Sequence, residues 1–107
     1  MKLRKILGID IGGSGVKGAI VDTKKGKLIT ERYRIPTPQP ATPEAVAAVI
    51  GKITRHFKWK GPVGVGFPGV IQQGIARTAA NVDDSWIDKD LNKLFSKVTG
   101  CKIHVVN

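Results

Sequence analysis

The segment from Asp10 to Gly18 constrains the fold most strongly, because four of its nine residues are glycines. Glycine disfavours helices and permits the backbone conformations that tight turns require. The segment follows a short apolar run, Lys5–Ile11, and leads into a second apolar stretch from Gly15 to Val21. This pattern predicts two adjacent strands joined by a glycine turn, with the first strand buried on both faces.

Later patterns predict a more exposed third strand, a proline-rich extended linker or lid edge, and then two helices that alternate with two strands. Thr42, Pro43 and Glu44 are typical of a helix start, and Gly100 is typical of a helix end. The predicted elements after the first two strands are Lys27–Arg34, Pro43–Phe57, Val63–Phe67, Leu91–Val98 and Lys102–Val106.

The order of these elements is βββαβαβ, which predicts an α/β fold with a mixed five-stranded sheet. Three consecutive strands pair as antiparallel hairpins, whereas parallel neighbours need a covering connection such as a helix. This order matches the ribonuclease-H-like fold. Residues 1–107 show no internal repeat, and we expect them to form one domain.

The charge of the chain favours a polyanionic partner. Lys and Arg number 18 against 8 Asp and Glu, a formal net charge of +10. Nucleic acid, an anionic membrane surface and inorganic polyphosphate all suit such a field, and so does the simpler interpretation that the lysines keep the protein soluble. Lys24, Lys25, Lys27, Lys58 and Lys60 are the candidate polyphosphate contacts.

The chain has one cysteine, Cys101, which excludes an intrachain disulfide and is predicted to be a small buried residue. No run approaches the roughly 20 apolar residues of a membrane span, and the first residues lead into a strand and not into a signal core. We therefore expect a cytoplasmic protein without a membrane partner.

The glycine turn has the composition of an anion site. Gly12 and Gly13 let backbone N–H groups approach a phosphate, Ser14 adds a hydroxyl, and Lys17 adds a positive charge. Asp10 is the candidate ligand for Mg²⁺, directly or through water. Phosphoryl transfer needs such positioning and charge neutralisation. The alternative is an ordinary glycine-rich hairpin, and the spacing is not that of a Walker motif.

The stretch LGIDIGGSGVKGAIVD, Leu7 to Asp22, resembles the first phosphate motif of the sugar-kinase, Hsp70 and actin superfamily, and in particular that of the ROK family. Many ROK members place Lys or Asn after the Ser or Thr, whereas this chain has Gly15 there and its cation at Lys17, which resembles the polyphosphate glucokinases. The resemblance implies an actin/hexokinase-type kinase that phosphorylates the 6-hydroxyl of glucose from polyphosphate or ATP with Mg²⁺. It also implies a homodimeric full-length protein.

Two later segments resemble the sugar-binding parts of the same family. Gly64–Val70 resembles the loop beside the sugar, which suggests Gly69, and Ala80–Trp86 resembles the segment that supplies Asn81 to glucose. An amide side chain can donate to and accept from hydroxyls. Alternatively, Asn81 belongs to an ordinary polar turn, and Trp86 is expected to pack in the core.

The end of the sequence matches the strand that precedes an Asn-Asp pair in this family. Asn107 is then a sugar ligand, and the general base is expected at the next position, after Asn107. Residues 1–107 are accordingly expected to be an N-terminal phosphate- and sugar-binding domain without its C-terminal domain or the His/Cys metal motif of many ROK proteins. Because a positioned base contributes roughly 10² to 10⁴ in rate, negligible activity is expected from this chain alone.

Two other functions use the same features differently. The basic charge and fold also suit a nuclease or nucleic-acid-binding module, but Asp10 lacks the further carboxylates that two-metal nucleases gather. A non-catalytic ROK-type sugar sensor is the second alternative, although no helix-turn-helix precedes the first strand. We therefore expect no nucleic-acid partner.

Overall fold

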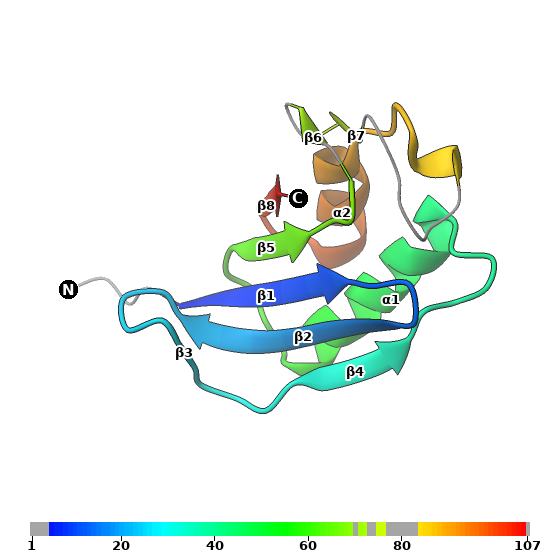
Figure 1. Cartoon of the computed structure of the whole chain (residues 1–107). Helices are drawn as coiled ribbons and strands as arrows, with labels where there is room; N and C mark the ends of the chain where they lie inside the picture. The colour runs from blue at the N-terminus through cyan, green and yellow to red at the C-terminus, as the bar shows by residue number, and fades with distance from the viewer. Residues whose placement is uncertain (1–4, 70, 73–74, 77–83, 107) are drawn as a thin grey trace.

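The computed structural model describes residues 5–69, 71–72, 75–76 and 84–106, and its elements follow the chain order shown in Figure 1. Their bounds are β1 Lys5–Ile11, β2 Gly15–Asp22, β3 Lys27–Leu28, β4 Tyr33–Pro36, α1 Pro43–His56, β5 Val63–Gly66, β6 Ile71–Gln72, β7 Ile75–Ala76, the 3-10 helix η1 Asp84–Trp86, α2 Leu91–Thr99 and β8 Ile103–Val106.

The main sheet is mixed, as the element order predicted. Its strands lie in the order β3-β2-β1-β5-β8, and β4 also pairs with β2. β1 is antiparallel to β2 and parallel to β5, which is in turn parallel to β8. The crossover from β1 to β5 contains α1, and the crossover from β5 to β8 contains α2. A separate hairpin, β6 with β7, was not predicted from the sequence.

The predicted third strand is divided into two short strands, which raises the main sheet to six strands. β3 pairs with Val21 and Asp22, whereas β4 pairs with the first half of β2. Between them, the Thr30 hydroxyl accepts a hydrogen bond from the Ile20 N–H at 3.1 Å. A side-chain oxygen thus takes the donor that a continuous strand would have paired with a backbone carbonyl.

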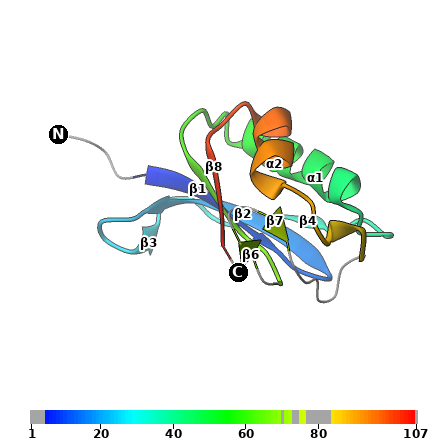
Figure 2. The same ribbon diagram turned by 90° about the horizontal axis from the view of Figure 1, so that it is seen from above.

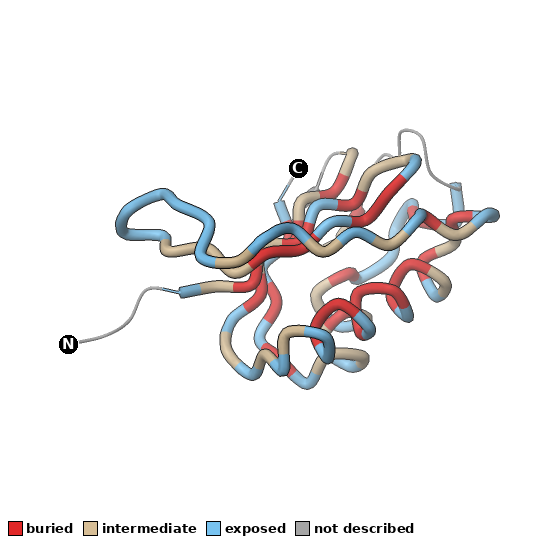
Figure 3. The backbone as a smooth tube through the Cα atoms, turned by 90° about the horizontal axis from the view of Figure 1, so that it is seen from below, coloured by how far each residue is buried: buried red, intermediate tan, exposed pale blue. Residues whose placement is uncertain are grey.

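Both helices pack on one face of the sheet (Figure 2). Buried residues are concentrated where the strands and α1 face each other, and the turn between β2 and β3 is exposed (Figure 3). α1 contributes Val46, Ile50 and Ile53 to the core, and α2 contributes Leu91 and Phe95. Alternate side chains of β1, β5 and β8 complete this single hydrophobic cluster. Cys101 is buried at its margin, as predicted.

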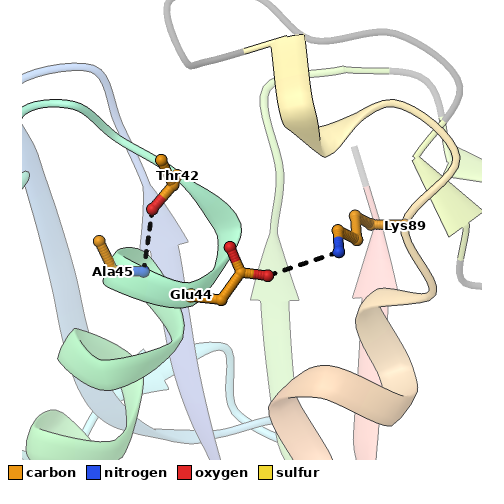
Figure 4. Close-up of polar contacts among 4 residues, drawn as sticks. All are labelled: Thr42, Glu44, Ala45 and Lys89. Atoms are coloured by element: carbon orange, nitrogen blue, oxygen red, sulfur yellow. Dashed lines mark hydrogen bonds and ion pairs between the residues drawn. The ribbon is translucent and has the colours of Figure 1, made fainter.

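The start of α1 is fixed by the signals that predicted it. The Thr42 hydroxyl accepts a hydrogen bond from the Ala45 N–H at 3.2 Å, and Pro43 occupies the first turn. Glu44 forms an ion pair with Lys89, which precedes α2, at 3.4 Å (Figure 4). The start of α1 is therefore held to the segment that leads into the second helix.

Trp86 is fully buried and joins η1 to the core. Its indole Nε1–H donates to the Ala41 carbonyl oxygen at 2.7 Å. Its ring packs against Phe67 and Phe95, with centroid distances of 4.9 and 6.1 Å. The expectation that Trp86 packs in the core is thus confirmed.

The opposite face of the sheet carries no helix among the described residues (Figure 2). Its small residues Gly8, Gly64 and Gly66 line an open groove of about 640 Å³. Asp10 and Lys17 lie in the same groove. The groove therefore runs along the bare face and reaches the end of the sheet that carries the glycine turn.

Candidate functional site

The parallel strands end together at one edge of the sheet. Asp10 of β1 is the register partner of Gly66 in β5, and Gly66 is the partner of Val106 in β8. A Cβ atom added at Gly66 would lie 3.3 Å from Asp10 Oδ1, so the carboxylate lies over this glycine. In open α/β sheets, ligands bind outside the carboxyl ends of the parallel strands. The glycine turn begins at this edge.

The turn between β1 and β2 is closed by its own backbone. The Gly12 N–H donates to the Gly15 carbonyl oxygen at 3.0 Å. A Cβ atom added at Gly12 would lie 2.9 Å from that same oxygen. Gly12 is therefore required by the close approach of the two backbone segments, and the turn cannot accept a larger residue there without opening.

A neighbouring segment binds the carbonyl oxygens of the turn. The Thr37 hydroxyl donates to the Gly12 oxygen at 2.6 Å. The Thr37 N–H donates to the Ser14 oxygen at 3.2 Å, and Arg34 Nη2 donates to the same oxygen at 2.8 Å. Gln39 Nε2 lies 3.5 Å from the Gly13 oxygen. The negative ends of these peptide dipoles are thus directed toward β4 and the proline-rich segment.

The N–H groups of Gly13 and Ser14 have no acceptor among the described residues. Gly13 is half-buried and Ser14 is exposed. Because unpaired N–H groups carry partial positive charge, two neighbouring ones form a concavity suited to an anion. An ordinary hairpin would have no need for three side chains that hold its carbonyl oxygens away, so this arrangement favours the phosphate site over the plain turn.

Three charged residues lie in a row beside the turn. Asp10 in β1 is opposite Lys17 in β2, and Lys17 is opposite Arg34 in β4. All three are exposed. Residues that are register partners have side chains on the same face of a sheet. The structure therefore brings Asp10, Gly12, Gly13, Ser14 and Lys17 together at one end of β1 and β2.

The predicted sugar-binding residues are only partly covered by the structure. Gly69 lies three residues after the end of β5, and its N–H donates to the Phe67 oxygen at 2.9 Å. The Phe67 N–H donates to the Val106 oxygen at 2.7 Å, which joins the ends of β5 and β8. Gly69 is thus near the edge that carries Asp10. Asn81 and Asn107 lie outside the described residues.

The candidate lysines lie far from the turn. Lys24, Lys25 and Lys27 follow the end of β2, which is about 17 Å along the strand from Lys17. Lys58 and Lys60 precede β5, whose first residue pairs with Leu7 at the opposite end of β1 from the turn. The structure therefore separates these five lysines from the Asp10 edge.

Arg34 and Thr37 are the residues of this site that the sequence patterns did not single out. Arg34 belongs to a segment predicted only as an exposed strand, and Thr37 belongs to the stretch predicted as a linker. The alternation along Tyr33–Pro36 carried a weak signal, because it places Arg34 on one face. Only the register of β4 against β2 shows which face that is.

No cluster of three or more His, Cys, Asp and Glu side chains has the arrangement of a metal site in the described ranges. Within the same ranges, neither helix is long and apolar enough to cross a membrane.

Known proteins resemble this chain over nearly all of its length. A polyphosphate glucokinase of Mycobacterium tuberculosis is 48% identical over 101 residues, which cover 94% of this chain and 38% of that protein. A polyphosphate glucokinase of Mycobacterium leprae is 55% identical over 89 residues, which cover 83% of this chain and 28% of that protein. The chain therefore spans well under half the length of these relatives.

A solved structure gives the same picture of the fold. The inorganic polyphosphate/ATP-glucomannokinase of Arthrobacter sp. strain KM matches with a TM-score of 0.91 and 48% identity, over 96% of this chain and 44% of that one. This match confirms the predicted α/β architecture, which is of the actin/hexokinase type. The ROK family model matches residues 6–107. This chain, with its glycine turn and mixed sheet, therefore belongs to the ROK family.

Proposed function

We propose that this chain is the N-terminal phosphate- and sugar-binding domain of a glucokinase that transfers a phosphoryl group from inorganic polyphosphate, or from ATP, to the 6-hydroxyl of glucose. The observation that carries the proposal is the glycine turn, in which side chains hold the carbonyl oxygens and leave the N–H groups of Gly13 and Ser14 open. The similarity to polyphosphate glucokinases supplies the donor and the sugar.

Each residue of the turn has a separate role in holding the donor. The N–H groups of Gly13 and Ser14 donate to a phosphate oxygen, and the Ser14 hydroxyl donates to another. Lys17, on the adjacent strand β2, neutralises negative charge on the phosphate. Such preorganised donors stabilise the charge that phosphoryl transfer spreads over the phosphate oxygens. This end of the sheet therefore binds and orients the donor.

The exposed Asp10 carboxylate suits a magnesium ion. Mg²⁺ is usually held by one or two carboxylates together with phosphate oxygens and water, so one carboxylate beside a phosphate site is sufficient. When bound, the ion neutralises charge on the donor phosphates. Asp10 would hold it on the groove side of the turn, where Gly66 leaves room for the carboxylate.

Glucose is proposed to bind at the same edge, with Gly69, Asn81 and Asn107 as contacts. In the transfer, the bond from the terminal phosphorus to the bridging oxygen breaks, and a bond from phosphorus to the glucose 6-oxygen forms. The hydroxyl proton passes to a carboxylate that we place immediately after Asn107, outside this sequence. The complete enzyme is proposed to be a cytoplasmic homodimer with a second domain.

Isothermal titration of the chain with inorganic tripolyphosphate and Mg²⁺ tests the donor site. A lost hydrogen bond to a charged ligand costs about 1.5 kcal/mol or more, so Ser14→Ala should weaken binding about tenfold. Lys52→Gln removes a charge from the exposed side of α1, on the far face of the sheet, and should leave affinity unchanged. Equal affinity of the Ser14→Ala variant and the wild-type chain would refute the proposed site.

The magnesium role has its own test. Asp10→Asn should remove most of the gain in tripolyphosphate affinity that Mg²⁺ gives the wild-type chain, because the neutral amide is a much weaker ligand for a hard cation. Its affinity in EDTA should stay near that of the wild-type chain. An unchanged Mg²⁺ effect in the variant would place the ion elsewhere.

A coupled glucose-phosphorylation assay tests whether residues 1–107 are active without the proposed base and second domain. The chain alone, with glucose, Mg²⁺ and polyphosphate or ATP, should show negligible turnover, because the proposed base and domain closure are outside it. Robust turnover would show that residues 1–107 hold a complete site, and the assignment of the base after Asn107 would be wrong.

A further inference from the structure

We propose that Arg34 is a second cation of the donor site, which binds a phosphate of the donor directly, and that Gly15 is glycine because it leaves room for this side chain. The inference rests on the proposed function and adds a residue to its donor site. It also explains why this chain has glycine after Ser14, where many ROK sequences have Lys or Asn.

The Arg34 side chain lies across Gly15 of the glycine turn. Arg34 pairs with Lys17, and Gly15 is two residues before Lys17 on the same strand. Gly15 and Lys17 therefore share a face of the sheet with Arg34. The Arg34 guanidinium crosses Gly15 to reach the Ser14 carbonyl oxygen, with Nη2 at 2.8 Å from it. The cation is thus brought to the centre of the turn.

Gly15 has no side chain, and the Arg34 guanidinium occupies the space where one would lie. A Cβ atom added at Gly15 would overlap Nε of Arg34 and would lie 2.8 Å from its Cζ and Nη2 atoms. Real Cβ atoms do not approach other atoms so closely. A residue with a side chain at position 15 would therefore displace the guanidinium. Gly15 and Arg34 therefore act as a pair, in which β4 supplies a second cation beside Lys17.

Arg34 has N–H groups left to bind a ligand. One Nη2–H bond is used by the Ser14 oxygen, and the guanidinium has further N–H groups on both terminal nitrogens and on Nε. No carboxylate of the described residues forms an ion pair with Arg34, and the side chain is exposed. Guanidinium groups bind phosphate with charge-assisted, often bidentate hydrogen bonds. Arg34 is therefore placed to hold an anion at the turn.

The ligand class that fits two adjacent cations is a chain of linked phosphates. Lys17 and Arg34 are opposite each other on neighbouring strands, and strands lie about 4.8 Å apart. A chain of linked phosphates carries more negative charge than inorganic phosphate, so two adjacent cations attract it more strongly. The pair thus favours a phosphate chain over inorganic phosphate.

The test compares Arg34→Gln and Arg34→Lys with the wild-type chain by titration with tripolyphosphate and with inorganic phosphate, at about 50 mM and about 500 mM NaCl. Arg34→Gln should weaken tripolyphosphate binding about tenfold at low salt, and this ratio should shrink at high salt because screening weakens the lost attraction. Arg34→Lys should recover part of the loss. The affinity for inorganic phosphate should change less, and Lys52→Gln should change neither affinity.

A double-mutant cycle tests the pairing with Gly15. Gly15→Ala should weaken tripolyphosphate binding in the wild-type background, because the methyl group displaces the guanidinium. The same change should have little further effect in the Arg34→Ala background, where the space is empty. Additive losses in the two variants would overturn the coupling between these residues.

The outcomes separate this inference from the function on which it rests. If the wild-type chain binds tripolyphosphate and Arg34→Gln binds it equally well, Arg34 is not a ligand and only this inference fails. A loss that is the same at both salt concentrations, with a lower melting temperature, would make Arg34 a brace of the turn and would also overturn it. No tripolyphosphate binding by the folded wild-type chain would refute the proposed function itself.

Discussion

Replacing Thr37 by valine removes one hydroxyl and keeps the shape of the side chain. That hydroxyl donates to the Gly12 oxygen at 2.6 Å, and Thr37 is 7% exposed. The variant leaves the carbonyl oxygen without this partner in a partly buried place. Leaving such a group unsatisfied costs about 1 to 3 kcal/mol. The Thr37 N–H still donates to the Ser14 oxygen, so Thr37 keeps one of its two hydrogen bonds to the turn.

Thermal unfolding followed by circular dichroism measures the cost. For a chain of this size, 1 kcal/mol shifts the melting temperature by about 4 to 8 °C, so Thr37→Val should melt at least about 4 °C below the wild-type chain. It should also bind tripolyphosphate more weakly, because the freed Gly12 carbonyl is no longer held away from the anion. Thr37→Ser keeps the hydroxyl and loses a methyl group, which costs about 0.8 kcal/mol in stability. Unchanged donor affinity in Thr37→Val, or an equal loss in Thr37→Ser, would refute the role given to the hydroxyl.

Two further predictions concern stability. Trp86→Phe removes the Nε1–H bond to the Ala41 oxygen and part of a fully buried ring, and should lower the free energy of unfolding in urea by about 2 to 4 kcal/mol; a loss below about 1 kcal/mol would show that the contact matters little. Glu44→Gln breaks the ion pair with Lys89. Because the side chains of Glu44 and Lys89 are 65% and 46% exposed, the substitution should change stability by less than about 1 kcal/mol. A larger effect of Glu44→Gln in the same urea titration would indicate that the pair acts through more than surface charge.

The elements that local signals specify were predictable from the sequence. α1 begins where Thr42 and Pro43 indicated. α2 ends at Thr99 with Gly100 as its C-cap, and the φ of 69° at Gly100 is the left-handed conformation expected of a helix C-cap glycine. The apolar runs identified β1, β5 and β8, but the prediction that the first strand is buried on both faces was wrong. These strands bury alternate residues, because the helices cover only one face of the sheet and small or polar residues such as Gly8 and Asp10 lie on the other. In each case the determining residues lie within a few positions of the element.

Features that depend on distant residues were not predictable. The gap between β3 and β4 depends on a Thr30 hydroxyl that bonds to the backbone ten residues earlier. The contact from Arg34 to Ser14 spans 20 positions, and that from Thr37 to Gly12 spans 25. The glycine turn itself was visible in the sequence. The side chains that orient it were not, because they are defined by strand register and not by any local pattern.

The hydrogen bonds from Arg34 and Thr37 to the turn also limit how this phosphate site can be transferred to another protein. A designed hairpin that copied only Gly12 to Gly15 would reproduce the tight backbone, but its carbonyl oxygens would be free to rotate toward the ligand and repel it. A working graft needs the turn together with an antiparallel neighbour that carries Arg34 and Thr37 in the same register. The smallest portable unit of this site is thus a three-stranded fragment and not a loop.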